Sequence, residues 1–175
     1  MLVTMAARIP SRTHGRPASR ARERGLTLVE LMTVLVVAAI LAAIALPSLA
    51  NVLAAQRLRA AGTDLVTSLL VARSEAIKRK GRVEVAPQSP GDWTSGWRVA
   101  AVATEEQFDR RDPPGLRVAV ALAPESLVYE RNGRLAGAGV TQFEFHDDER
   151  QPGVEARCVT IDPSGLPKLE KGACR

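Results

Sequence analysis

The stretch RGLTLVELMTVLVVAAILAAIAL, residues 24–46, decides the fold because it predicts a long N-terminal helix. From Leu26 to Leu46 there are 21 residues, and Glu30 is the only charged one. About 20 consecutive apolar residues suffice for a helix to cross a bilayer. Pro47 follows at once, and a proline inside a helix removes a hydrogen bond and bends the helix. The sequence therefore predicts a membrane-length helix with a kink at Pro47.

The excess positive charge of the chain lies before this helix. Residues 1–25 contain six arginines and one acid, and their net charge of +5 equals that of the whole chain. Residues 26–175 carry 18 basic and 18 acidic side chains and are therefore neutral. Arginines flanking a membrane helix keep that flank in the cytoplasm, so we expect the rest of the chain on the other side. The pI of 9.9 reflects the arginine-rich tail and is weak support for a nucleic-acid partner.

Two ordinary explanations of the apolar run conflict with Glu30. A secretory signal is cleaved after its apolar region, and residues 48–50, Ser-Leu-Ala, have the small-x-small form of such a site. A plain membrane anchor is the other explanation. Neither has a use for an acid, and a carboxylate deep in a span costs roughly 2.5–3.5 kcal/mol. A third interpretation, cleavage before the apolar run, gives the acid a function.

Residues 24–30, Arg-Gly-Leu-Thr-Leu-Val-Glu, resemble the N-terminus of type IV pilins and type II secretion pseudopilins. The resemblance implies that prepilin peptidase cuts between Gly25 and Leu26 and methylates the new N-terminus. Most members have Phe where this chain has Leu26. The resemblance also makes Glu30 the assembly residue, which pairs with the new amino group of a neighbouring subunit. In a helix starting at Leu26, the dipole favours this acid by only about 0.3–1 kcal/mol, so it needs such a partner.

The helical pattern resumes beyond Pro47. Apolar residues recur there at spacings of three, four and seven, which places them on one helix face: Leu58, Leu65, Leu69, Ala72 and Ala76. We therefore expect four segments. These are a cleaved basic leader at 1–25, the transmembrane half of the helix at 26–47, its amphipathic half at 48–81, and a periplasmic β-rich domain at 82–175.

The C-terminal half contains short runs rich in valine or aromatic residues, separated by turn signals. The predicted strands are 82–86, 96–102, 116–122, 126–130, 140–146 and 156–161. Strands that follow one amphipathic helix predict an α+β fold. The pilin resemblance implies the same architecture, in which the long helix packs on an antiparallel β-sheet domain.

Two internal motifs narrow the resemblance. Residues 72–79, ARSEAIKR, and the glycine–tryptophan motif at 91–97 are similar to those of the GspH/FimT group of minor pseudopilins and minor pilins, as is the segment 159–165. Members of this group are structural subunits, which implies other pseudopilins or pilins, prepilin peptidase and the inner membrane as partners. Trp93 and Trp97 are expected to pack in the core, with ligand stacking as the alternative.

The only cysteines, Cys158 and Cys174, both lie in the domain expected outside the cytoplasm. An even pair in an oxidising compartment predicts a disulfide. It would hold down residues 166–175, which otherwise read as a free tail. Two free thiols are the alternative.

The sequence contains no pattern typical of an enzyme, so we expect no catalytic residues, no cofactor and no metal. His146 stands next to three consecutive acids, residues 147–149, and oxygen ligands suit Ca²⁺ or Mg²⁺. Side chains of consecutive residues diverge, however, so a solvated turn is the expected role of this cluster.

Two functions remain after this reading. One is a structural minor pseudopilin of a type II secretion system, and the other is a minor pilin of a type IV pilus, involved in assembly or in DNA binding and uptake. DNA-binding members of the group carry a Gly-Arg-x-Arg-like motif, and residues 165–168 match it only at Gly165 and Lys168. Further contacts would have to come from other basic residues, namely Lys171, Arg175, Arg131 and Arg134.

Overall fold

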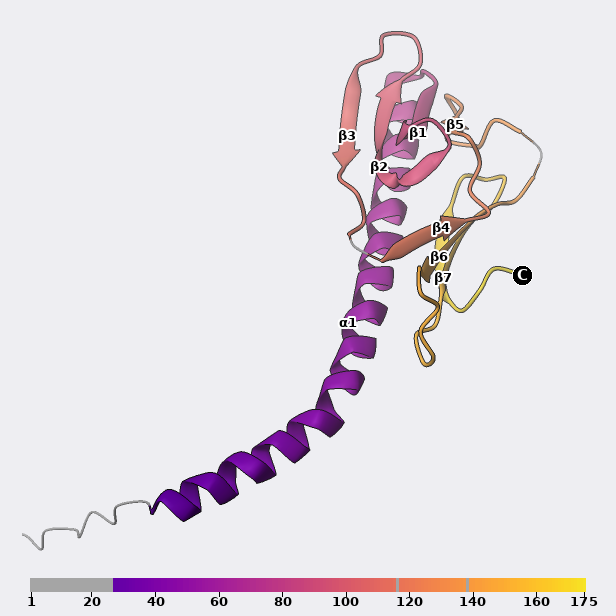
Figure 1. The fold of residues 1–175 in the computed structure, drawn as a ribbon. Coiled ribbons are helices and arrows are strands. Elements are labelled where there is room, and N and C mark those ends of the chain that lie inside the picture. Colours follow the sequence, from indigo (N-terminus) through magenta and orange to yellow (C-terminus); the bar gives the residue numbers. More distant parts are fainter. Residues whose placement is uncertain (1–26, 116, 138) are drawn as a thin grey trace, which may run out of the picture. The chain divides into compact units, whose positions relative to one another are not determined.

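A computed structural model describes residues 27–115, 117–137 and 139–175, with the backbone alone at 44–48 (Figure 1). The chain divides into two units, one ending at Ile40 and the other comprising Leu41–Arg175. A single α-helix, α1 (Leu28–Arg79), belongs to both. The helix assignment runs through Pro47 without a break, so the predicted interruption does not end the helix. A kink at that residue stays a prediction.

Two four-stranded antiparallel sheets follow the helix. The first has the order β3-β2-β1-β5 and contains β1 (Val83–Ser89), β2 (Asp92–Ala101), β3 (Gln107–Arg111) and β5 (Leu127–Tyr129). The second has the order β4-β6-β7-β8 and contains β4 (Val118–Ala121), β6 (Thr141–Asp147), β7 (Arg157–Ile161) and β8 (Pro167–Lys171). The α+β class and the helix packed on antiparallel sheets are as predicted.

The core forms where the C-terminal half of α1 meets both sheets. The five helix residues expected on one face are all buried, with exposed fractions of 0–1%. They share one hydrophobic cluster with Val85 and Val99 of the first sheet and with Phe143 and Val159 of the second. The helix therefore serves as the common layer against which both sheets bury their apolar faces.

Both tryptophans lie in this core. Trp93 packs edge-on against Phe143, with 4.7 Å between ring centroids, and so joins the two sheets. The indole Nε1 of Trp97 donates a hydrogen bond of 3.0 Å to the hydroxyl of Ser68, which is fully buried in α1. Gly96 has a φ of +88°, and a Cβ there would lie 2.3 Å from the carbonyl oxygen of Arg111. Only glycine fits, which explains the glycine of the glycine–tryptophan motif.

Two strands were missed at the sequence level. β3 has one apolar residue, Phe108, and α1 holds the strand mainly through polar contacts: Ser68 donates a hydrogen bond of 2.7 Å to Asp109. β8 falls in the segment 166–175, for which the sequence predicts no strand and only the disulfide as an anchor. It pairs with β7 in full register from Pro167 to Lys171. The sequence did not predict this strand, because backbone pairing with β7 orders a segment that has little hydrophobic pattern of its own.

We expect the buried stripe of α1 to dominate the free energy of unfolding. Leu65→Ala should lower it by about 2–5 kcal/mol, because the substitution removes apolar contacts and leaves a cavity in the core. Leu70→Ala is the matched control, since Leu70 lies on the same helix with 46% of its surface exposed. Chemical unfolding of the protein purified in detergent measures both. Equal effects of the two substitutions would contradict the assignment of the core face.

Candidate assembly site

The N-terminus of α1 is closed by Thr27. Its hydroxyl accepts a hydrogen bond of 3.2 Å from the backbone N–H of Glu30, and its carbonyl accepts one of 3.1 Å from the N–H of Leu31. Thr27 is therefore the N-cap and Glu30 the third helical residue, which is the Thr-x-x-Glu spacing of a capping box. The predicted start of the helix is Leu26, whereas the described helix begins at Leu28. The threonine hydroxyl sets this start, because it takes up one of the free N–H groups of the first turn.

Glu30 is exposed, and so are the apolar side chains that follow it. Ten large apolar residues from Leu28 to Leu41 have exposed fractions of 50–71%. They occur on every side of the helix, so no polar face is left for water. A helix that is apolar all round normally lies in a membrane or in a protein core. This segment therefore requires a cover from outside the chain.

The remaining predicted residues of this region are described only in part. Gly25 and Leu26, the predicted cleavage pair, lie outside the described residues. Within the described part of the chain, no helix has the length and apolar character needed to span a membrane.

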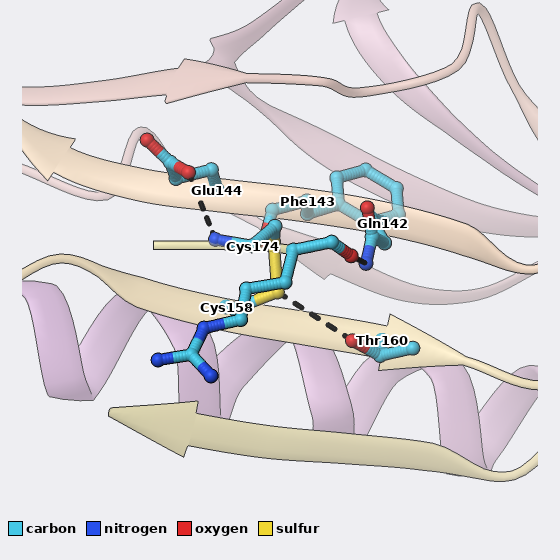
Figure 2. Close-up of a disulfide and its surroundings, with 7 residues drawn as sticks. Gln142, Phe143, Glu144, Cys158, Thr160 and Cys174 are labelled. Carbon is cyan, nitrogen blue, oxygen red and sulfur yellow. Dashed lines mark hydrogen bonds between the residues drawn. A yellow bond between two sulfur atoms is a disulfide. The ribbon is translucent and has the colours of Figure 1, made fainter. Parts of the chain in front are cut away.

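Cys158 and Cys174 form a disulfide that fastens the end of the chain to the second sheet (Figure 2). Their Cα atoms are 5.1 Å apart. The N–H of Cys174 donates a hydrogen bond of 3.0 Å to the Glu144 carboxylate, and the Gln142 amide donates one of 2.9 Å to the carbonyl of Arg175. Pairing in β8 and these contacts together hold residues 166–175 against β6 and β7.

Comparison with known proteins agrees with this architecture. The family model described as Type II transport protein GspH matches residues 61–165, which is more than half of the chain. The chain belongs to this family. The model described as Prokaryotic N-terminal methylation motif matches residues 20–46, the segment that contains Gly25, Leu26 and Glu30. The predicted membership in the GspH/FimT group is thus confirmed. No curated protein matches the chain.

Two solved structures share the fold of this GspH-family chain. Both are crystal forms of the type IV minor pilin FimU of Pseudomonas aeruginosa. One has a TM-score of 0.56 and 21% sequence identity and covers 66% of this chain and 89% of FimU. The other has a TM-score of 0.54 and 23% identity and covers 64% and 91%. At this identity the likeness establishes the fold alone, which is the pilin-like fold predicted.

The basic residues considered for DNA contact do not form one basic face. Lys168 and Lys171 are three positions apart in β8, so they lie on opposite sides of the sheet. Lys168 pairs with Glu170 at 2.8 Å and Lys171 with Glu155 at 2.9 Å. Arg175 lies at the chain end beside the disulfide, and Arg131 and Arg134 are exposed next to β5. The charge available for phosphate groups at β8 is therefore small.

The acidic cluster beside His146 is split between the core and the surface. Asp147 is buried at the end of β6, and its carboxylate accepts a hydrogen bond of 3.2 Å from the N–H of Gln151. Glu149 is exposed and pairs with Arg117, which lowers the pKa of that glutamate. Among the residues that the structure describes, no group of His, Cys, Asp and Glu is arranged to hold a metal ion. Asp147 is therefore not solvated as expected, because its carboxylate is buried and binds the backbone of the turn that follows β6.

The capping role of Thr27 is the feature that the sequence reading overlooked. Its signal was present, since Thr27 and Glu30 have the spacing of a capping box. The buried hydroxyl of Ser68 gave no such signal. Its partners, Trp97 and Asp109, come from strands 29 and 41 residues further along the chain.

The disulfide should stabilise the unit that comprises Leu41–Arg175. It links residues 16 positions apart, and a loop of this size contributes about 3 kcal/mol. We expect the double variant Cys158→Ala/Cys174→Ala, or reduction of the unmodified protein, to lower the free energy of unfolding by that amount in chemical unfolding. Reductant should leave the double variant unchanged. Labelling of both cysteines by a thiol reagent without reductant would contradict the pairing.

A second prediction concerns the turn after β7. The Ser164 hydroxyl donates a hydrogen bond to Asp162, and backbone N–H groups add to it, so the pKa of the Asp162 carboxyl is lowered. A lowered pKa contributes stability above the unfolded value of about 3.9, and this contribution is lost as the pH falls through the folded value. Asp162→Ala should therefore lower Tm at pH 7, and the difference from the unmodified protein should shrink towards pH 3.

Asp148→Ala is the control for this measurement, because Asp148 is also exposed but follows β6. A Tm difference for Asp162→Ala that stays constant from pH 7 to pH 3 would show that the charge of Asp162 does not contribute.

Proposed function

We propose that this GspH-family chain is a minor pseudopilin, a structural subunit of the periplasmic pseudopilus of a type II secretion system that supports protein export across the outer membrane. One observation carries the proposal. An apolar helix, exposed on all sides and with a single acid at its capped N-terminus, continues into the helix of a GspH-type domain. The apolar side chains of such a segment pack against lipid or against apolar helices of other subunits.

Two different covers follow from the chemistry of the helix. Before assembly, the inner membrane covers the apolar residues 28–41, with the arginine-rich residues 1–25 on the cytoplasmic side. Prepilin peptidase then removes residues 1–25 at Gly25 and methylates Leu26. In the filament, helices of neighbouring subunits replace the lipid. The periplasmic unit, with its disulfide and paired surface charges, stays in an oxidising aqueous compartment.

Glu30 gives the packed helices their register. The Thr27 hydroxyl caps the backbone N–H of Glu30, and the Glu30 carboxylate makes no ion pair with any residue that the structure describes. The new amino group of Leu26 on a neighbouring subunit is a cation of the right charge, and an apolar surrounding strengthens such a pair. This chemistry is structural, and we propose no catalytic role.

A minor pilin of a type IV pilus is the alternative, and the FimU-like fold is compatible with it. The two systems use the same N-terminal segment, so the fold does not separate them. Direct DNA contact by the periplasmic unit is the weaker part of this alternative, because Lys168 and Lys171 are paired and face opposite sides.

The test of the proposal uses three variants of the full-length chain in its own cells. Gly25→Leu should leave uncleaved precursor in the inner membrane, because a bulky side chain blocks close approach of the peptidase to the backbone. Glu30→Gln should be cleaved normally but enter the filament fraction about tenfold less, because it keeps the Thr27 cap and loses one charged hydrogen bond. Immunoblots of membrane and sheared filament fractions measure both.

Glu30→Asp is the matched control, since it keeps the charge and should retain part of the assembly. Normal filament content of Glu30→Gln would contradict the assembly role of this residue. Loss of an exported protein from the medium after deletion of the gene supports the secretion system. Loss of surface pili with normal secretion supports the type IV pilus instead.

A further inference from the structure

A groove beside α1 gathers positive charge at one edge of the second sheet. Its lining residues come from the helix and from the last two strands, and they are Arg59, Arg157, Leu169, Glu170 and Lys171. Three of the five are cations from three different elements. Such a meeting of like charges in one groove costs free energy in the isolated chain.

Pairing of β7 with β8 creates this arrangement. Arg157 and Lys171 stand directly opposite each other in the antiparallel register. Residues at alternate positions share a face of a sheet, so Leu169 lies on the same side as Lys171. Leu169 reaches α1 at Gly62, where a Cβ would lie 2.7 Å from its Cδ1 atom. This contact holds β8 one turn beyond Arg59 on the helix.

The charges of the groove are only partly compensated. Lys171 pairs with Glu155 at 2.9 Å, and both side chains are more than half exposed, so the pair is weak. Glu170 is engaged with Lys168 at 2.8 Å. Neither Arg59 nor Arg157 makes an ion pair with any residue that the structure describes. The Nε atom of Arg157 is buried and lacks a hydrogen-bond partner in the same part of the chain.

A buried donor without a partner costs about 1–3 kcal/mol, and native structures keep few of them. Here the unpaired donor belongs to an arginine that faces another cation across the strand pair. An anion bound in the groove would satisfy the donor and offset the repulsion together. Arginine is suited to this task, because its planar guanidinium binds a carboxylate through two parallel hydrogen bonds.

We propose that this arginine groove binds a carboxylate side chain of a neighbouring pilin-like subunit in the filament. The inference rests on the proposed function, since it needs a neighbouring subunit. It adds a second, periplasmic contact to the one at Glu30. The groove then fixes how the folded domains of neighbouring subunits align in the filament.

The position of the groove favours a protein carboxylate over a lipid phosphate. Arg59 lies 13 residues beyond Leu46, the end of the predicted span, in the same helix. That is about 20 Å along the helix axis. The polar layer on one side of a bilayer is only about 5–7 Å thick. Lipid headgroups would therefore end well before the groove.

Site-specific photo-crosslinking tests this proposal in the full-length chain in its own membrane. A benzoylphenylalanine placed at position 155 lies beside Lys171 of the groove, because the exposed Glu155 that it replaces pairs with Lys171 at 2.9 Å. After irradiation we expect an adduct with a pilin-like subunit, and fragment masses should place it next to an Asp or Glu. Arg59→Gln should reduce the adduct by about tenfold, the factor for one lost charge-assisted hydrogen bond, and Arg59→Gln/Arg157→Gln should reduce it further.

Arg57→Gln is the matched control, because Arg57 is exposed on the same helix two residues earlier and lines a different groove. It should leave the adduct unchanged. Replacing the partner's acid by its amide should remove the adduct as Arg59→Gln does. An adduct with phospholipid, or an adduct that survives both arginine substitutions, would overturn the proposal.

Thermal unfolding separates a binding role from a structural one. If the arginines only stabilise the fold, Arg59→Gln should lower Tm. Since the substitution relieves repulsion between like charges, we expect Tm of the isolated protein to stay the same or to rise by a few degrees. A clear fall in Tm together with loss of the adduct would count against the proposal.

The outcome is also separable from that of the proposed function. If the chain never enters the filament fraction, the proposed function fails. If the chain assembles in a Glu30-dependent manner and the probe at position 155 gives no adduct with a subunit, only the proposal for the arginine groove is wrong.

Discussion

Burial of one stripe of α1 is the interaction on which the rest of the structure depends. The stripe runs from Leu58 to Ala76 and meets residues of both sheets in a single cluster. Without the helix, each sheet would expose an apolar face, and the core aromatic Phe143 would lose part of its cover. The hydrophobic effect acts on area without direction, so it fixes the layers but not the side-by-side position of the sheets. Polar contacts provide that position.

The buried hydroxyl of Ser68 is the central polar contact. It accepts a hydrogen bond from Trp97 of β2 and donates one to Asp109 of β3. Three elements are therefore aligned by one side chain in which donor and acceptor are both used. Arg111 adds a contact of 3.3 Å to the same carboxylate. This network allows β3, which has little apolar surface, to form the edge of the first sheet.

The sequence predicted those parts of the molecule that follow from regular patterns. The helix face, the α+β class and six of the strands came from periodicity, and the pilin-like identity came from residues 24–30 and the internal motifs. Periodicity did not predict β3 and β8. The position of β3 depends on the hydrogen bond from Ser68, and that of β8 on backbone pairing with β7. At the N-terminus, Thr27 and Glu30 showed the capping pattern. In the arginine groove, Arg59, Arg157 and Lys171 are more than ten residues apart in sequence, and only the strand register brings them together.

Gly62 and the arginine groove point to the same part of the fold. A glycine inside a helix costs about 1 kcal/mol relative to alanine, and two like charges opposite each other on paired strands are also unfavourable. Both local costs occur where β8 docks on α1, since Leu169 occupies the space at Gly62 and Lys171 follows it on the same face. The disulfide then fastens the chain just beyond β8. Local conflicts that the fold maintains tend to mark functional sites. The packing of Leu169 explains the glycine without any partner. The pair of like charges has a separate origin, and a bound carboxylate would compensate it, so only this second cost calls for a partner.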